Sequence, residues 1–128
     1  MTYTIDRLIA DADIHAVDAR VRAALTAKGF GVLTEIDVAA TMKKKLDKDM
    51  PAYIILGACN PNMAWQAIGI EARVGAMLPC NVILRAVAGG VEVSAVDPVA
   101  SMQAIENTEL AAVAAKVRDL LGEAVHAA

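Results

Sequence analysis

Residues 80–96 read Cys-Asn-Val-Ile-Leu-Arg-Ala-Val-Ala-Gly-Gly-Val-Glu-Val-Ser-Ala-Val. Apolar and polar side chains alternate on both sides of Gly89-Gly90, which is typical of β-strands with one buried face. Glycine adopts the positive φ that a two-residue hairpin turn requires, so the pair predicts such a turn. We therefore expect antiparallel strands over residues 80–88 and 91–96.

A turn at Gly89-Gly90 sets the register of this hairpin. It places Leu84 opposite Ala95 on an apolar face and Arg85 opposite Ser94 on a largely polar face. This division is expected of an antiparallel sheet that helices cover on one side.

Three further strands are expected upstream of the hairpin, over residues 2–9, 30–36 and 53–59. The last of these, Tyr-Ile-Ile-Leu-Gly-Ala-Cys, is apolar at every position. Such a run favours the middle of the sheet, where both faces of a strand are at least partly covered.

Helices are expected wherever an Asp or Asn can accept hydrogen bonds from the free amides at a helix start. The expected starts are Asp11 or Asp13, Asp37, Asn60, Asp97 and Asn107. Glycine ends the first helix at Gly29 and the third at Gly69. Residues 70–78 have no clear period and are expected to form a loop, and the start at Asp97 is expected to give only a short turn.

The 128 residues fit a single domain, 1–128, which can bury a continuous core because 57% of them are hydrophobic. The order of the elements predicts a two-layer α+β sandwich with a mostly antiparallel sheet and extra short helices.

Charge and hydropathy exclude two classes of partner. A net charge of −3, with only one Trp, two Tyr and one Phe, argues against nucleic acid. No apolar stretch approaches the ~20 residues of a spanning helix, so no membrane partner is expected. The N-terminus has no basic-then-apolar signal segment, which favours a cytoplasmic location where a structural disulfide is disfavoured.

Segments 28–37, 53–61, 78–82 and 93–98, which contain both cysteines and Asp97-Pro98, resemble the family catalogued as domain of unknown function 302. The resemblance implies a β-α-β(4)-α arrangement of the TATA-box-binding-protein-like class. It implies no established activity. The fold name does not imply DNA binding, because function belongs to sites rather than to folds.

The two cysteines lie in mirrored tripeptides, Cys59-Asn60-Pro61 and Pro79-Cys80-Asn81. If strands 53–59 and 80–88 are antiparallel neighbours, both thiols lie at the same end of the sheet. Cys80 then belongs to the covered face and Asn81 to the opposite face. The candidate ligand-binding residues at this end of the sheet are Cys59, Asn60, Pro61, Cys80, Asn81 and Asp97.

Each candidate also has a purely structural interpretation. Cys59 precedes a helix start, where free amides and the helix dipole can stabilise a thiolate, but it can equally pack as a small hydrophobic residue. For Cys80, on the covered face, we favour simple packing. Asp97 is a candidate pocket carboxylate at the mouth of the site beside Asn60 and Asn81, but capping the Pro98 turn is its favoured role.

No set of metal ligands is assigned, because neither His15 nor His126 has metal-ligand spacing to a cysteine. Met63 and Met77 lie close to the cysteines in sequence. Their thioethers would favour Cu(I) if a metal were bound.

The sequence favours a small cytoplasmic ligand-binding or sensor-like domain, and it names no cofactor. We expect a homodimer, because a single layer of helices leaves one side of strand 53–59 as an apolar surface. A thiol-dependent enzyme or soft-metal binder that uses Cys59 is the first alternative. A structural or partner-binding dimer module is the second. Whether any reaction is catalysed stays open.

Overall fold

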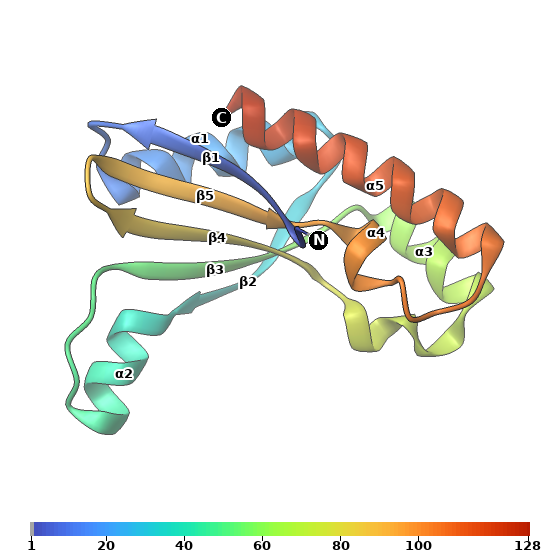
Figure 1. The fold of residues 1–128 in the computed structure, drawn as a ribbon, viewed down its shortest axis with the longest axis horizontal. Coiled ribbons are helices and arrows are strands. Elements are labelled where there is room, and N and C mark those ends of the chain that lie inside the picture. The colour runs from blue at the N-terminus through green and yellow to red at the C-terminus, as the bar shows by residue number, and fades with distance from the viewer. Residues whose placement is uncertain (1) are drawn as a thin grey trace.

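The computed structural model of the protein describes residues 2–128 (Figure 1). Its five strands are β1 (Thr4–Ala10), β2 (Gly31–Asp37), β3 (Tyr53–Cys59), β4 (Cys80–Val87) and β5 (Gly90–Val96). Its helices are α1 (Ile14–Ala27), α2 (Val38–Leu46), α3 (Pro61–Ile70), the 3-10 helix η1 (Ala72–Met77), α4 (Pro98–Ser101) and α5 (Thr108–Ala127). This is the predicted α+β sandwich.

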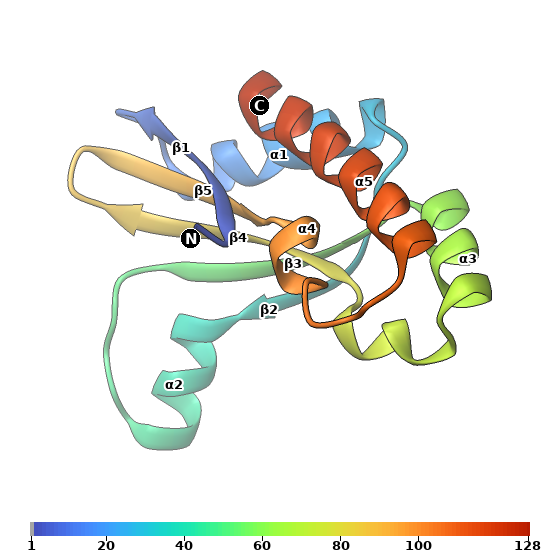
Figure 2. The same cartoon turned by 45° about the vertical axis from the view of Figure 1, so that its right-hand side comes forward.

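The five strands form one antiparallel sheet in the order β1-β5-β4-β3-β2. Helices α1 and α5 contact each other and lie on the same face of the sheet (Figures 1 and 2). On that face, Val82, Leu84 and Val93 are fully buried. We call the opposite side the open face.

The prediction that strand 53–59 is central was wrong, because β4 occupies the middle of the sheet and β3 lies between β4 and the edge strand β2. Strand β1 pairs with β5 at the far edge, which moves the centre by one strand. Helix α2 contacts β3, and the β3 side chains Tyr53 and Ile55 on the open face are partly buried.

The hairpin register differs from the predicted one by two residues. Leu84 lies opposite Val93 and Arg85 opposite Glu92, and the turn residues are Ala88 and Gly89. Gly90 is the first residue of β5 rather than part of the turn. Glycine is required at this position because a Cβ would lie 2.2 Å from the carbonyl oxygen of Ile9 in the neighbouring strand β1. A shift of two residues preserves the side-chain parity, so the predicted division between the two faces holds.

The helix starts were predicted correctly at Asp13, Asp37, Asn60, Asp97 and Asn107, whose side chains all accept backbone hydrogen bonds as N-caps.

The end of α3 was predicted wrongly. The helix passes Gly69, which does not adopt positive φ, and ends at Ile70. The expected loop over 70–78 instead contains η1, because the fully buried Val74 anchors it against Ala67 and Leu110.

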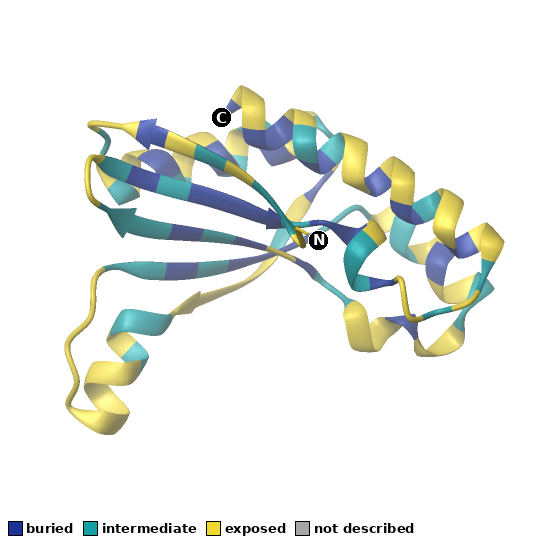
Figure 3. Ribbon diagram, in the orientation of Figure 1, coloured by how far each residue is buried: buried dark blue, intermediate teal, exposed yellow. Residues whose placement is uncertain are grey.

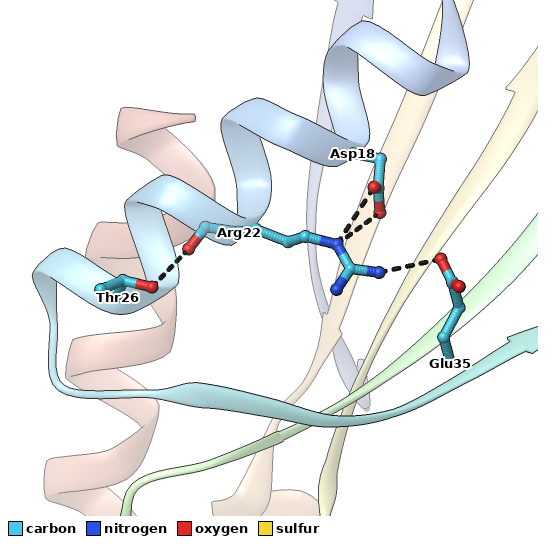
Figure 4. Close-up of polar contacts among 4 residues, drawn as sticks. All are labelled: Asp18, Arg22, Thr26 and Glu35. Carbon is cyan, nitrogen blue, oxygen red and sulfur yellow. Dashed lines mark hydrogen bonds and ion pairs between the residues drawn. The ribbon is translucent and has the colours of Figure 1, made fainter.

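Polar contacts hold α1 and α5 in place over the sheet. Arg22 of α1 donates from Nε to Asp18 (3.0 Å) and from Nη2 to Glu35 of β2 (2.8 Å), as Figure 4 shows. At the other edge, Arg7 of β1 donates to the carbonyl oxygens of Val125 (3.2 Å) and His126 (2.8 Å). These carbonyls belong to the last turn of α5, where no intrahelical donor exists.

Because adjacent residues of β4 point to different faces of the sheet, substitutions at Leu84 and Arg85 should destabilise the protein by very different amounts. Leu84→Asp should destabilise the protein by about 4 kcal/mol or more, because it removes a buried side chain and buries an unpaired charge. Arg85→Ala should cost less than about 1 kcal/mol, because the Arg85–Glu92 pair is partly exposed to solvent. Urea titrations of both variants measure the difference, and equal losses would contradict this assignment of faces.

Candidate functional site

The two cysteine motifs meet at one end of the sheet. Strands β3 and β4 are antiparallel neighbours with Ala58 opposite Cys80, so Cys59 lies one residue beyond that pair. Asn60 then caps α3 by accepting a hydrogen bond from the Met63 amide at 3.3 Å. Cys59, Asn60 and Cys80 line a common pocket.

This pocket, which we call the thiol pocket, lies between the sheet end, α3 and α5. It lies at the junction of two hydrophobic clusters. One is the core between the sheet and its helices, and the other is formed by Ala67, Val74, Met102, Leu110 and Ala114. Its lining is almost wholly apolar and comprises Phe30, Ala58, Cys59, Asn60, Met63, Ala64, Ala67, Leu78, Pro79, Cys80, Pro98, Met102, Leu110, Val113, Ala114 and Val117.

The space inside the thiol pocket is small. Its cavity volume is about 30 Å³, room for one or two water-sized groups. Sites for drug-sized ligands enclose about 300–1,000 Å³. A larger ligand can therefore enter only if a wall of the pocket moves.

Cys80 lies on the covered face, as predicted, and is 5% exposed. Burial, with a smaller contribution from the nearby Cys59, raises the pKa of the Cys80 thiol to about 11. The side chain is therefore a neutral thiol at physiological pH and a poor nucleophile. Cys59, by contrast, is only partly buried at the end of β3.

Three of the predicted site residues lie outside the thiol pocket. Pro61 is exposed at the first turn of α3, and Asn81 is exposed on the open face. Asp97 is not among the residues that line the pocket, and it caps α4, which was its favoured role. Its Oδ1 accepts from the Val99 amide at 2.9 Å, and its Oδ2 pairs with Arg118 Nε at 3.1 Å, so capping and ion pairing engage both oxygens.

The pocket also contains residues that the sequence did not single out, including Phe30 and the wall supplied by α5. Gly57 supports the site from the open face. A Cβ there would lie 2.1 Å from Thr34 Oγ1 and 2.7 Å from Pro79 Cγ, so only glycine permits this packing. A glycine inside an otherwise apolar strand is a sequence signal for such a close approach.

Within residues 2–128, no group of three or more His, Cys, Asp or Glu side chains is arranged to hold a metal ion. Of the two methionines near the cysteines in sequence, Met63 lines the thiol pocket, whereas Met77 lies outside it and is 42% exposed.

A second concavity, the open-face groove, has a volume of about 590 Å³. The Arg85–Glu92 ion pair lies in it, and Ser94 beside the pair is only 4% exposed. The groove is lined by Tyr3, Thr4, Asp6, Tyr53, Asn81, Ile83, Arg85, Glu92, Ser94 and Val96. It is therefore wider and more polar than the thiol pocket. None of the helices described is long and apolar enough to cross a membrane.

Comparison with known proteins identifies the family to which this chain belongs. The family model "Domain of unknown function DUF302" matches residues 7–128, and the chain belongs to this family. The structure is similar to the crystal structure of an uncharacterized conserved DUF302 protein from Bacillus stearothermophilus, with a TM-score of 0.92 and 21% sequence identity. The match covers 98% of each chain, and at this identity it establishes the fold alone. The comparison with curated proteins gives no match.

The raised pKa of Cys80 predicts a specific loss of stability at alkaline pH. The unfolded thiol loses its proton near pH 9 and the folded one near pH 11, so the folded state binds more protons between these values. The stabilisation is complete below about pH 9 and should fall by about 3 kcal/mol as the pH rises to 11. Because other groups titrate in this range, the measurement is the difference between wild type and Cys80→Val in urea titrations. Parallel pH profiles would contradict the prediction.

Proposed function

We propose that this protein is a small cytoplasmic ligand-binding or sensor-like domain whose site is the thiol pocket. The observation that carries the proposal is the apolar cavity at the seam of two clusters, with Cys59 and Asn60 in its lining. Seams of this kind between packed elements are common locations for small-ligand sites. The ligand class that fits this lining is a small apolar molecule or group.

The chemistry of the lining supports binding rather than catalysis. Apart from the two thiols, the lining side chains are apolar or, at Asn60, an uncharged amide. A nucleophilic thiol is ordinarily activated by an adjacent base or cation. Cys59 has no such neighbour in the pocket lining, and the high pKa of Cys80 keeps that thiol protonated.

Helix α3 supports the sensor-like part of the proposal. Its Met63, Ala64 and Ala67 line the pocket, while Trp65 on the same helix is 82% exposed. A ligand larger than the cavity enters when this wall is displaced, while the sheet, α5 and the segments around Pro79 and Pro98 form the other walls. A shift of α3 would change the exposed surface around Trp65. Binding of a ligand inside the pocket would then be detectable at the surface of the protein. Trp65 is the single tryptophan of the chain, so its fluorescence reports the displacement.

A ligand retained from the native host should be visible by native mass spectrometry. We expect an added mass above the 13.4 kDa polypeptide that disappears under denaturing conditions. Ala64→Val should abolish the added mass by filling space inside the pocket that Ala64 lines, whereas Ala112→Val, a matched change on the exposed side of α5, should leave it unchanged. The unmodified mass for wild type under both conditions would contradict this site.

The thiol-dependent enzyme or soft-metal binder stays the alternative, favoured by the presence of Cys59, Cys80 and Met63 in one pocket. Timed alkylation at pH 7 with peptide mapping separates the two hypotheses. The binding domain predicts that Cys80 resists labelling until the protein unfolds and that Cys59 reacts no faster than a model thiol. Labelling of Cys59 well above the model rate would favour the alternative. Inert thiols with no retained ligand would favour the structural module.

We also propose that the domain acts as a homodimer through its open face. Every strand contributes an apolar side chain there, among them Leu8, Ile36, Ile83 and Val96. Among the helices of residues 2–128, none lies across this face as α1 and α5 lie across the other. Surfaces of this kind on soluble proteins commonly mark interaction sites.

Light scattering at micromolar concentrations should therefore give twice the 13.4 kDa chain mass. Ile83→Asp should give a folded monomer, because it places a charge at the centre of the apolar surface. Lys116→Asp on the exposed side of α5 is the control and should remain dimeric. A wild-type mass near 13 kDa at all accessible concentrations would rule out the homodimer.

A further inference from the structure

The open-face groove has a buried polar residue at its floor. Ser94 is 4% exposed although it lines this groove, and Figure 3 shows β5 in the colour of buried residues toward its carboxyl end. Asp6 of β1 and Ile83 of β4 lie directly opposite Ser94, and Glu92 precedes it by two residues on the same face. All three side chains are longer than serine. Ser94 therefore forms the floor of a depression, which we call the Ser94 hollow.

Two carboxylates border the Ser94 hollow. The Ser94 hydroxyl donates to Oε1 of Glu92 at 3.4 Å, which places this carboxylate beside the hollow. Asp6 is the diagonal neighbour of Glu92 across the β1–β5 pair, and diagonal neighbours in a sheet are about 7–8 Å apart. A small group above Ser94 is therefore within reach of both carboxylates.

The charges around the hollow favour a cation. Arg85 Nη2 also donates to Oε1 of Glu92, and this ion pair is partly exposed. The hydrogen bond and charge of Glu92, with smaller contributions that include Asp6, raise the pKa of Arg85. Asp6 itself is exposed and has no ion-pair partner within residues 2–128. One guanidinium against two carboxylates gives the groove a net charge of −1, which attracts cations and repels anions.

The rest of the groove accommodates an apolar group. Ile83 and Val96 lie next to Ser94 on the open face and are partly buried, and the groove volume of about 590 Å³ is far larger than a single inorganic ion needs. An alkylammonium ion matches both parts of the groove. Its three N–H donors match three acceptors, which are the carboxylates of Asp6 and Glu92 and the hydroxyl oxygen of Ser94. Its hydrocarbon chain can lie over Ile83 and leave water.

We propose that the Ser94 hollow binds the ammonium group of a small primary alkylamine. Asp6 and Glu92 are the charged acceptors, Ser94 supplies the third acceptor, and the alkyl chain lies over Ile83. This site is separate from the thiol pocket and goes beyond the function proposed above. It lies on the face proposed for the homodimer, so the amine and the partner copy compete for one surface, and amine binding raises the dimer dissociation constant.

Charge variants test the sign of the preferred ligand. The probe is hexylammonium, titrated into ¹⁵N-labelled protein at low salt, and the amide shifts of β1 and β5 give its dissociation constant. Asp6→Asn should weaken binding about tenfold, because it removes the unpaired carboxylate. Arg85→Ala should tighten binding by about threefold, because it releases Glu92 from its ion pair. Ser94→Val should abolish binding by filling the hollow, and Asp119→Asn on the exposed side of α5 is the control.

The opposite effects of Asp6→Asn and Arg85→Ala would support the site. Hexanoate that binds more tightly than hexylammonium and is lost in Arg85→Ala would show an anion site and overturn it. Shifts at Met63 and Ala67 that Asp6→Asn leaves unchanged would place the probe in the thiol pocket instead. A wild type that binds no hexylammonium overturns the site whatever its oligomeric state. A dimer that persists with the site saturated overturns the competition.

Discussion

Coverage of the sheet on one face only is the constraint on which the rest of this structure depends. Helices α1 and α5 bury Val82, Leu84 and Val93 completely, and the alternation of side chains along each strand then leaves every neighbouring residue on the open face. The core, the direction in which Cys80 points and the uncovered apolar side chains all follow from this choice. Helix α2 follows the edge strand β2 and contacts β3, and it has no buried residue.

The thiol pocket arises because the helical layer is longer than the sheet. Helix α5 extends past the strand ends, where η1, α3 and α4 build a second cluster around Leu110. Two separately packed clusters leave a small apolar cavity where they meet, and the ends of β3 and β4 deliver the two cysteines to it. Burial at this junction also accounts for the raised pKa of Cys80. In the proposed function, a ligand enters at this junction of the two clusters by displacing α3.

Capping explains why several polar candidates carry no free functional group. Asp97 and Asn60 satisfy helix amides, and Asp97 also binds Arg118. Arg7 donates to the last carbonyls of α5, and Arg22 donates to Asp18 of α1 and Glu35 of β2.

Local chemistry in the sequence determined the elements and their faces. Asp and Asn caps identified five helix starts, and alternation assigned Leu84 and Cys80 to the covered side, because both signals act within a few residues. Contacts between segments far apart in the sequence decided the hairpin register, the order of the strands and the ion-pair partner of Asp97. The approach of Ile9 to Gly90 moved the hairpin register, the pairing of β1 with β5 made β4 central, and Arg118 engaged Asp97. The α5 wall of the thiol pocket belongs to this second group, since residues more than 30 positions apart meet there only after the helix packs across the sheet end.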